Sequence, residues 1–96
     1  MSKLKIKVHK IKGTCPIYKK GDTFYIIDGH KLQTDMLICV HSLSSIIPYY
    51  VALSRKISPK DLGLSNDDNA AYVQCLDPCE YTRGGTVIFK ITIHSQ

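Results

Sequence analysis

Apolar and polar residues alternate near both ends of the chain, and this pattern constrains the fold more than any other feature. Over residues 3–9, every second residue is apolar and the residues between them are Lys or His. The same period recurs from Val87 to Ile93. A period of two is typical of a β-strand that buries one face. We therefore predict a first strand over 3–9 and a last strand over 86–94.

Three shorter strands are predicted between these two. Residues 23–27 are all aromatic or β-branched, which favours a strand. The dipeptide Asp28-Gly29 that follows is a strong hairpin signal, so residues 31–33 are expected to return beside it. Residues 71–74 form another strand that leads into Cys75. The chain therefore has four or five strands, joined mostly by hairpin-length connections.

One main helix is predicted over about 44–56. Pro48 fits its first turn, where a missing N–H costs nothing. The candidate caps are the serines at its start, Ser42, Ser44 and Ser45. The face expected to pack on the sheet consists of Ile47, Tyr50, Val51 and Ser54, with Leu53 alongside.

A short helical turn is predicted over about 59–63, capped by Ser58 and ended by Gly63. The element order predicts an α+β fold, a small and mostly antiparallel sheet covered by one helix. With 96 residues, the chain is expected to be a single domain over 1–96. It has no apolar run near the ~20 residues that a membrane span needs, and its N-terminus does not resemble a signal peptide. We therefore expect a cytoplasmic protein with no membrane partner.

Four cysteines in so short a chain are the main functional signal. In a reducing compartment, a cysteine cluster is more typical of a metal site or a reactive thiol than of disulfides. Each cysteine lies at the edge of a predicted element, as a tetrahedral zinc site built from separate loops requires. We predict a zinc site formed by Cys15, Cys39, Cys75 and Cys79.

The spacing of these cysteines leaves other interpretations open. An iron–sulfur cluster also uses four thiolates, although the spacing matches no usual ferredoxin run. Cys39, between two aliphatic residues, could instead be an inert core residue. His41 could replace one thiolate as a metal ligand, or it could simply help to cap the helix. With four thiolate ligands the site would be structural, whereas three would leave a position for water or substrate and allow catalysis.

Two other functions compete with a metal-binding accessory or interaction domain. One is a thiol enzyme or sulfur carrier, with Cys15 or Cys75 as the nucleophile and His41 as the base. Cys15 follows Lys12 and precedes two further lysines, and such local positive charge activates a thiol. A core of this size also gains stability from a partner, so a homo-oligomer or a partner subunit is expected.

The third function is nucleic-acid binding. The net charge is +5, and seven lysines lie before the first acidic residue, Asp22. Such a basic region can bind RNA or DNA. The lysines of residues 3–7 nevertheless alternate with aliphatic residues, as they do on the solvated face of an ordinary strand. We therefore rank nucleic-acid binding through the Lys3–Lys20 region below the two thiol-based functions.

Nearly the whole chain resembles a family of small, largely uncharacterised archaeal and bacterial proteins. The similarity rests on the opening strand from Lys3 to Val8, Cys15-Pro16 with Gly21-Asp22-Thr23-Phe24, Ile38-Cys39, the segment Ile47 to Ser54, and Cys75-Leu76-Asp77-Pro78 ahead of the strand Val87 to Ile91. The resemblance implies a compact α+β domain whose recurring thiols match Cys15, Cys39 and Cys75. Cys79 matches a position that only some members fill with cysteine. The family suggests no reaction.

Overall fold

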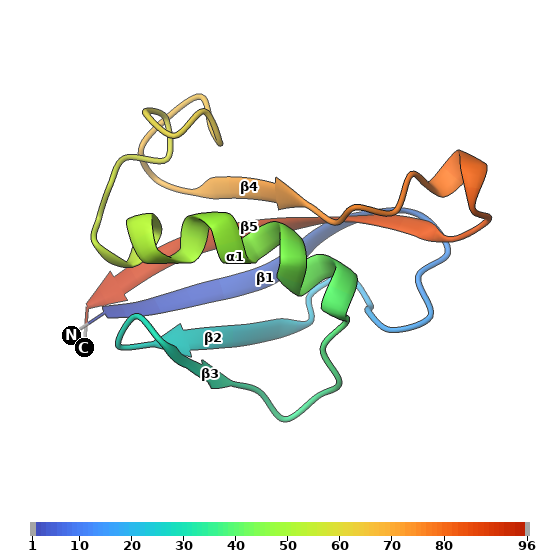
Figure 1. The fold of residues 1–96 in the computed structure, drawn as a ribbon, viewed down its shortest axis with the longest axis horizontal. Coiled ribbons are helices and arrows are strands. Elements are labelled where there is room, and N and C mark those ends of the chain that lie inside the picture. The colour runs from blue at the N-terminus through green and yellow to red at the C-terminus, as the bar shows by residue number, and fades with distance from the viewer. Residues whose placement is uncertain (1, 96) are drawn as a thin grey trace.

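The computed structural model describes residues 2–95 as a five-stranded antiparallel sheet with one helix lying across one face (Figure 1). The predicted α+β class is thereby confirmed. The strand order is β3-β2-β1-β5-β4, so the first and last strands of the chain are neighbours in the middle of the sheet. The strands are β1 (Ser2–Gly13), β2 (Thr23–Ile27), β3 (Lys31–Gln33), β4 (Ala71–Gln74) and β5 (Gly85–Ser95).

The longest strand pairing is that of β1 with β5, in the middle of the sheet. Its register runs from Ser2 opposite Ser95 to Gly13 opposite Gly85. The register shifts between Val8 and Lys10, so His9 is an extra residue in β1. A bulge of this kind places two successive residues on the same face, which lets β1 continue to Gly13 with Ile11 turned back toward the core. The predicted first strand over 3–9 was therefore too short.

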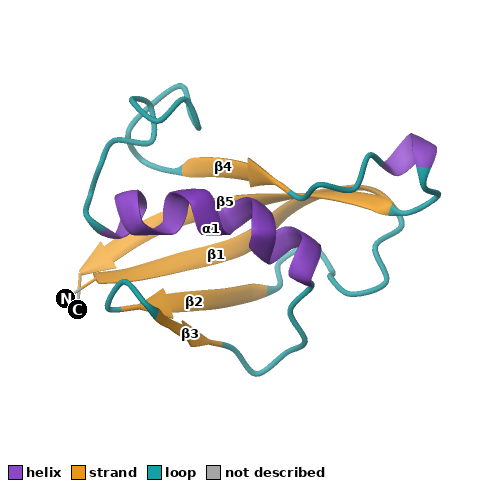
Figure 2. Cartoon of the chain, viewed as in Figure 1, coloured by secondary structure: helices purple, strands orange, loops and turns teal. Residues whose placement is uncertain are grey.

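The helix α1 (Val40–Ser54), drawn across the sheet in Figure 2, starts earlier than predicted. It also packs through a different face. Cys39 occupies the N-cap position and no side chain caps the helix, so the serines predicted as caps were wrong. Pro48 lies inside the helix and not in its first turn. The buried residues are Ser42, Ile46 and Leu53, with Tyr49 and Tyr50 partly buried, whereas Ile47 and Val51 are about half exposed.

The helix packs through a stripe of residues that includes a polar side chain. Residues 42, 46, 49 and 53 recur at spacings of four, three and four, which places them on one side of a helix. A search for apolar residues overlooks one member of this set, the buried Ser42 in the first turn. The polar Ser42 is fully buried because Tyr18 provides its hydrogen-bond partner.

The predicted helical turn over 59–63 is present only as hydrogen-bonded turns. Leu62 N–H donates to Ser58 O at 3.1 Å, and Leu64 N–H donates to Pro59 O at 2.9 Å. A 3-10 helix, η1 (Cys79–Tyr81), was not predicted and lies in the connection between β4 and β5. Among residues 2–95, no helix is both long and apolar enough to cross a membrane.

The core lies between α1 and one face of the sheet. Phe24 and Phe89 are fully buried there, and their ring centroids lie 6.2 Å apart in an edge-to-face arrangement. Tyr18, from the loop after β1, packs edge-on against Phe89 at 5.4 Å. Within residues 2–95, no helix covers the opposite face of the sheet. The molecule therefore presents two separate regions for function, the end of the core near the start of α1 and the uncovered sheet face.

Candidate functional site

Three of the four cysteines line one cavity of about 160 Å³ at the start of α1. Cys15 comes from the loop after β1, Cys39 from the N-cap of α1, and Cys75 from the residue after β4. The cavity is completed by the ring of Tyr18 and by neighbouring residues that include His41, Ser42 and Asp77. The fold thus brings together three thiols that are 24 and 36 residues apart in sequence (39 − 15 and 75 − 39).

Cys15 and Cys75 are held by backbone hydrogen bonds to sulfur. The N–H of Tyr18 donates to Cys15 Sγ at 3.4 Å, and the N–H of Val87 donates to Cys75 Sγ at 3.2 Å. The thiol of Cys75 donates weakly to Gly85 O at 3.7 Å. Cys75 is buried, whereas Cys15 and Cys39 are partly exposed. Two of the three sulfurs therefore receive N–H donors that would orient them as thiolate ligands.

A closed ring of hydrogen bonds fixes Cys39 beside the cavity. The N–H of Cys39 donates to the phenol oxygen of Tyr18 at 2.9 Å, and Ser42 Oγ donates to Cys39 O at 2.8 Å. Since Ser42 has one hydroxyl proton, Tyr18 donates to Ser42 across their 2.7 Å contact. Burial raises the pKa of the Tyr18 phenol above its usual value, although its hydrogen bonds to Ser42 and Cys39 lower it. The phenol therefore stays a neutral donor at ordinary pH.

The start of α1 contributes positive electrostatic potential to the cavity. The first turns of a helix expose N–H groups that together act as a partial positive charge. No side chain caps α1, and its first turn contains no acidic residue. The thiols of Cys39 and its neighbours in the cavity are therefore the groups available to interact with this end of the helix.

Cys79 is separated from the other three cysteines by its hydrogen bonding. It is not among the residues that line the cavity. Its thiol donates to Lys12 O at 3.5 Å, and a Cβ added to Gly13 would lie 2.5 Å from its sulfur. Cys79 thus packs against the end of β1, with a backbone φ of 38° at the start of η1. The predicted set of four thiols is reduced to three that share a cavity.

His41 and Asp77 differ in how free they are to act as a fourth ligand. Asp77 Oδ1 accepts hydrogen bonds from Cys79 N–H at 2.9 Å and from Thr82 Oγ1, which commits the carboxylate to the turn around η1. His41 is exposed at the cavity edge, and its side chain does not cap the helix. His41 is therefore the nitrogen ligand that the site could recruit.

The arrangement of the thiols in this structure is not that of a formed metal site. Within residues 2–95, no group of three or more His, Cys, Asp or Glu side chains has the geometry to hold a metal ion. Coordination by these cysteines would therefore require rotation of their side chains toward a common point.

Sequence reasoning missed Tyr18 and Ser42, which position Cys39. Neither belongs to a motif, because a phenol and a hydroxyl 24 residues apart become partners only when the loop after β1 folds under α1. The one available signal was Ser42 at the start of the predicted helix, which favoured a capping role instead.

The fold and this cavity define the class of protein, a small α+β domain with a three-thiol cavity at a helix N-terminus. Comparison with family models, with curated protein sequences and with solved structures finds no match to this chain. The family resemblance of the sequence motifs therefore stays a prediction, and function must be argued from the site itself.

Proposed function

We propose that the protein is a small metal-binding domain that holds one zinc ion with Cys15, Cys39 and Cys75. The observation that carries this proposal is the shared cavity, which three thiols from separate segments line. Thiolates are preferred ligands of Zn²⁺, and catalytic zinc sites typically use three protein ligands with a fourth, open position. His41 or a water molecule would fill that position.

The surroundings of the thiols support a thiolate site. Zinc with three thiolates carries one net negative charge, which the N-terminus of α1 stabilises. The N–H donors at Cys15 and Cys75 would orient the ligands and offset their charge. The ligands come from three different parts of the fold, so bound metal would link the loop after β1, the helix and the end of β4.

The test is titration of reduced, metal-free protein with Co²⁺ and then Zn²⁺. Cobalt bound to thiolates gives an intense charge-transfer absorption, and displacement by zinc reports the relative affinity. One ion per chain is expected, with zinc also raising the melting temperature because it binds only the folded state. The variant Cys15→Ser should lose the charge-transfer band and the zinc-induced stabilisation.

Cys79→Ser is the matched control, because it makes the same chemical change outside the cavity. It should keep the metal stoichiometry of the parent protein. Circular dichroism of the metal-free variants separates lost ligation from lost folding. Absence of cobalt binding in the parent protein, or equal losses in Cys15→Ser and Cys79→Ser, would overturn the proposal. In His41→Ala, a retained thiolate band with altered d–d absorption would identify His41 as the fourth ligand.

A second candidate function is thiol chemistry, because Cys15, Cys75 and His41 all line the same cavity. Cys15 is the better nucleophile of the two on access, since it is partly exposed and Cys75 is only 6% exposed. Alkylation of metal-free native protein with iodoacetamide tests this function. Rapid labelling of Cys15 alone, slowed in His41→Ala, would support it, whereas slow and similar labelling of all thiols would exclude it.

The accessory role implies a partner, either a second copy of the chain or another protein. The small core and the exposed aliphatic residues Ile47 and Val51 on the outer side of α1 support this prediction. Light scattering at several protein concentrations, with and without zinc, tests self-association. If the protein is a monomer under all of these conditions, its partner would have to be a protein of different sequence.

A further inference from the structure

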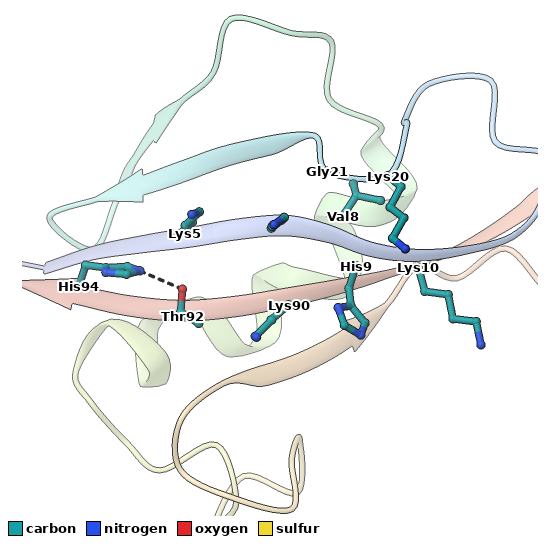
Figure 3. A pocket seen from close by; sticks show the side chains of 10 residues that line it. Lys5, Val8, His9, Lys10, Lys20, Gly21, Lys90, Thr92 and His94 are labelled. Atoms are coloured by element: carbon teal, nitrogen blue, oxygen red, sulfur yellow. Dashed lines mark hydrogen bonds between the residues drawn. The ribbon is translucent and has the colours of Figure 1, made fainter.

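The uncovered face of the sheet is strongly basic. Figure 3 shows this face, with lysine and histidine side chains projecting from it. A shallow hollow of about 600 Å³ runs across β1 and β5 and up to the loop before β2. Its charged and titratable lining residues are all Lys or His: Lys5, Lys7, Lys10, Lys20, Lys90, His9 and His94.

No Asp or Glu of residues 2–95 is among the residues that line the hollow. All eight Asp and Glu residues lie outside the five strands and α1, in loops or in η1. Within residues 2–95, one ion pair is found, between Lys31 and Asp28 at the β2–β3 hairpin. The lysines of the hollow are therefore not neutralised by carboxylates of the described chain.

The positions of Lys7 and Lys90 are the strongest indication that the positive charge of this face serves a function. They stand directly opposite each other on β1 and β5. Like charges at opposed positions destabilise an antiparallel pair. A sheet selected for stability alone would place an opposite charge or a neutral residue at one of these positions. An anion that binds between the two ammonium groups would remove the repulsion.

The bulge at His9 increases the density of cationic groups on this face. His9 is the extra residue of β1, and Lys10, the next residue, pairs with Ile88 of β5. Both side chains line the hollow, as Figure 3 shows. Without the bulge, strict alternation would turn one of the two toward the core.

Aromatic side chains border the basic hollow on both sides. Tyr25 lies on β2 opposite Lys5, and Lys3 Nζ lies 4.2 Å from its ring centroid. Tyr72 lies on β4 opposite Lys90, and its ring packs edge-on against His9 at 5.4 Å. The neighbours of Tyr25 and Tyr72 in sequence are buried, so alternation places both rings on the open face. Tyr72 is 38% exposed and Tyr25 is partly exposed. Accessible aromatic rings beside cations are the elements that stack and bind single-stranded nucleic acids.

We propose that this face binds a single-stranded nucleic acid, with phosphates on the Lys5, Lys7 and Lys90 ammonium groups and a base stacked on Tyr25. The major groove of a duplex is ~12 Å wide and admits a helix or a two-stranded ribbon. Strands lie ~4.8 Å apart, so a face that spans β2, β1 and β5 with their side chains is too broad for it. A membrane surface is disfavoured because the hollow offers no exposed apolar side chain for insertion. The thiol cavity lies on the helix side of the sheet, so this proposal is independent of the metal site.

The test is fluorescence anisotropy of a short labelled oligouridylate RNA at increasing salt, starting near about 50 mM. Binding is expected, with an affinity that falls steeply as salt rises. The double variant Lys7→Gln/Lys90→Gln should bind roughly tenfold more weakly. Its log–log salt slope should be smaller by about 0.7, since the two ammonium groups share one phosphate and each phosphate contact on a single strand contributes about 0.7. Tyr25→Val should weaken binding roughly tenfold with little change in the slope, because stacking is not electrostatic.

Two controls separate a defined face from general attraction to a polyanion. Lys56→Gln/Lys60→Gln removes the same charge from residues outside the hollow and should leave RNA affinity within about twofold. Tyr81→Val, on a ring that is 87% exposed outside the sheet, should also be neutral. Absence of binding at low salt, equal losses in the two lysine pairs, or preferred binding to duplex RNA, polyglutamate or anionic vesicles would overturn the proposal.

Discussion

The phenol oxygen of Tyr18 lies 2.7 Å from the hydroxyl oxygen of Ser42, inside the core between the loop after β1 and the first turn of α1. Both side chains are buried, with Tyr18 3% exposed and Ser42 fully enclosed. Together with the backbone of Cys39 they form the closed ring of hydrogen bonds that sets the start of the helix. This contact places Cys39 at the thiol cavity.

Removal of the Tyr18 hydroxyl should destabilise the protein. In Tyr18→Phe, the partly buried N–H of Cys39 loses its acceptor, and an unsatisfied buried group costs about 1–3 kcal/mol. Urea denaturation measures the loss. The double variant Tyr18→Phe/Ser42→Ala should cost less than the sum of the two single variants, since the residues share one hydrogen bond. Strict additivity would mean that the ring does not act as a unit.

Tyr18 should also make stability fall in alkaline solution. Burial raises the pKa of its phenol in the folded state above the ordinary value of 10.0. Above pH 10 the unfolded chain therefore releases the Tyr18 proton while the folded protein retains it, so folding becomes less favourable as pH rises. Urea midpoints measured between about pH 9 and 11 should fall less steeply in Tyr18→Phe than in the parent. Tyr81→Phe, on an exposed ring, should follow the parent protein.

Gly85→Ala should disturb the thiol cavity through the backbone. A Cβ at Gly85 would lie 2.8 Å from both Cys15 N and Thr14 C, closer than real contacts allow. The segment that carries Cys15 would have to move, with an expected cost of about 1–3 kcal/mol and weaker cobalt binding. Thermal denaturation and the cobalt titration measure the two effects.

Gly63→Ala is the comparison for Gly85→Ala. A Cβ there meets no atom within 4 Å, although its φ of +77° disfavours a side chain. It should therefore lower stability by about 1 kcal/mol and leave metal binding unchanged. If Gly85→Ala bound cobalt as tightly as Gly63→Ala, Cys15 would not be a ligand held by this close backbone contact.

Lys90→Gln should stabilise the fold. It removes the like-charge pair with Lys7, and cross-strand pairs of this kind are worth about 0.2–1 kcal/mol. Chemical denaturation at low salt should show the gain, and added salt should reduce it by screening the repulsion in the parent protein. A more stable variant that binds RNA more weakly would show that the lost affinity does not come from unfolding. A destabilised Lys90→Gln would contradict the repulsion on which the nucleic-acid proposal depends.

The strands were predictable because each carries its own local signal. The alternation in β1 and β5, the β-branched and aromatic residues of β2, and Asp28-Gly29 at the hairpin all act within a few residues. The helix was predicted in type but misplaced by four residues at its start, because Pro48 was read as a first-turn residue. The start at Val40 goes with a contact between distant segments, because Ser42 and the N–H of Cys39 both bond to the phenol of Tyr18. No pattern within the helix reveals that contact.

Local patterns in the sequence account for the inward-facing residues of β5 and of β1 up to Val8, and for the residue types that are available for chemistry. Alternation and side-chain polarity are local properties, so they do not depend on what the chain packs against. Packing between distant segments sets three other features: β5 lies between β1 and β4, Cys79 lies outside the cavity of the other thiols, and Lys7 faces Lys90. These relationships join segments far apart in sequence, and they follow from the burial of one shared core rather than from any local preference.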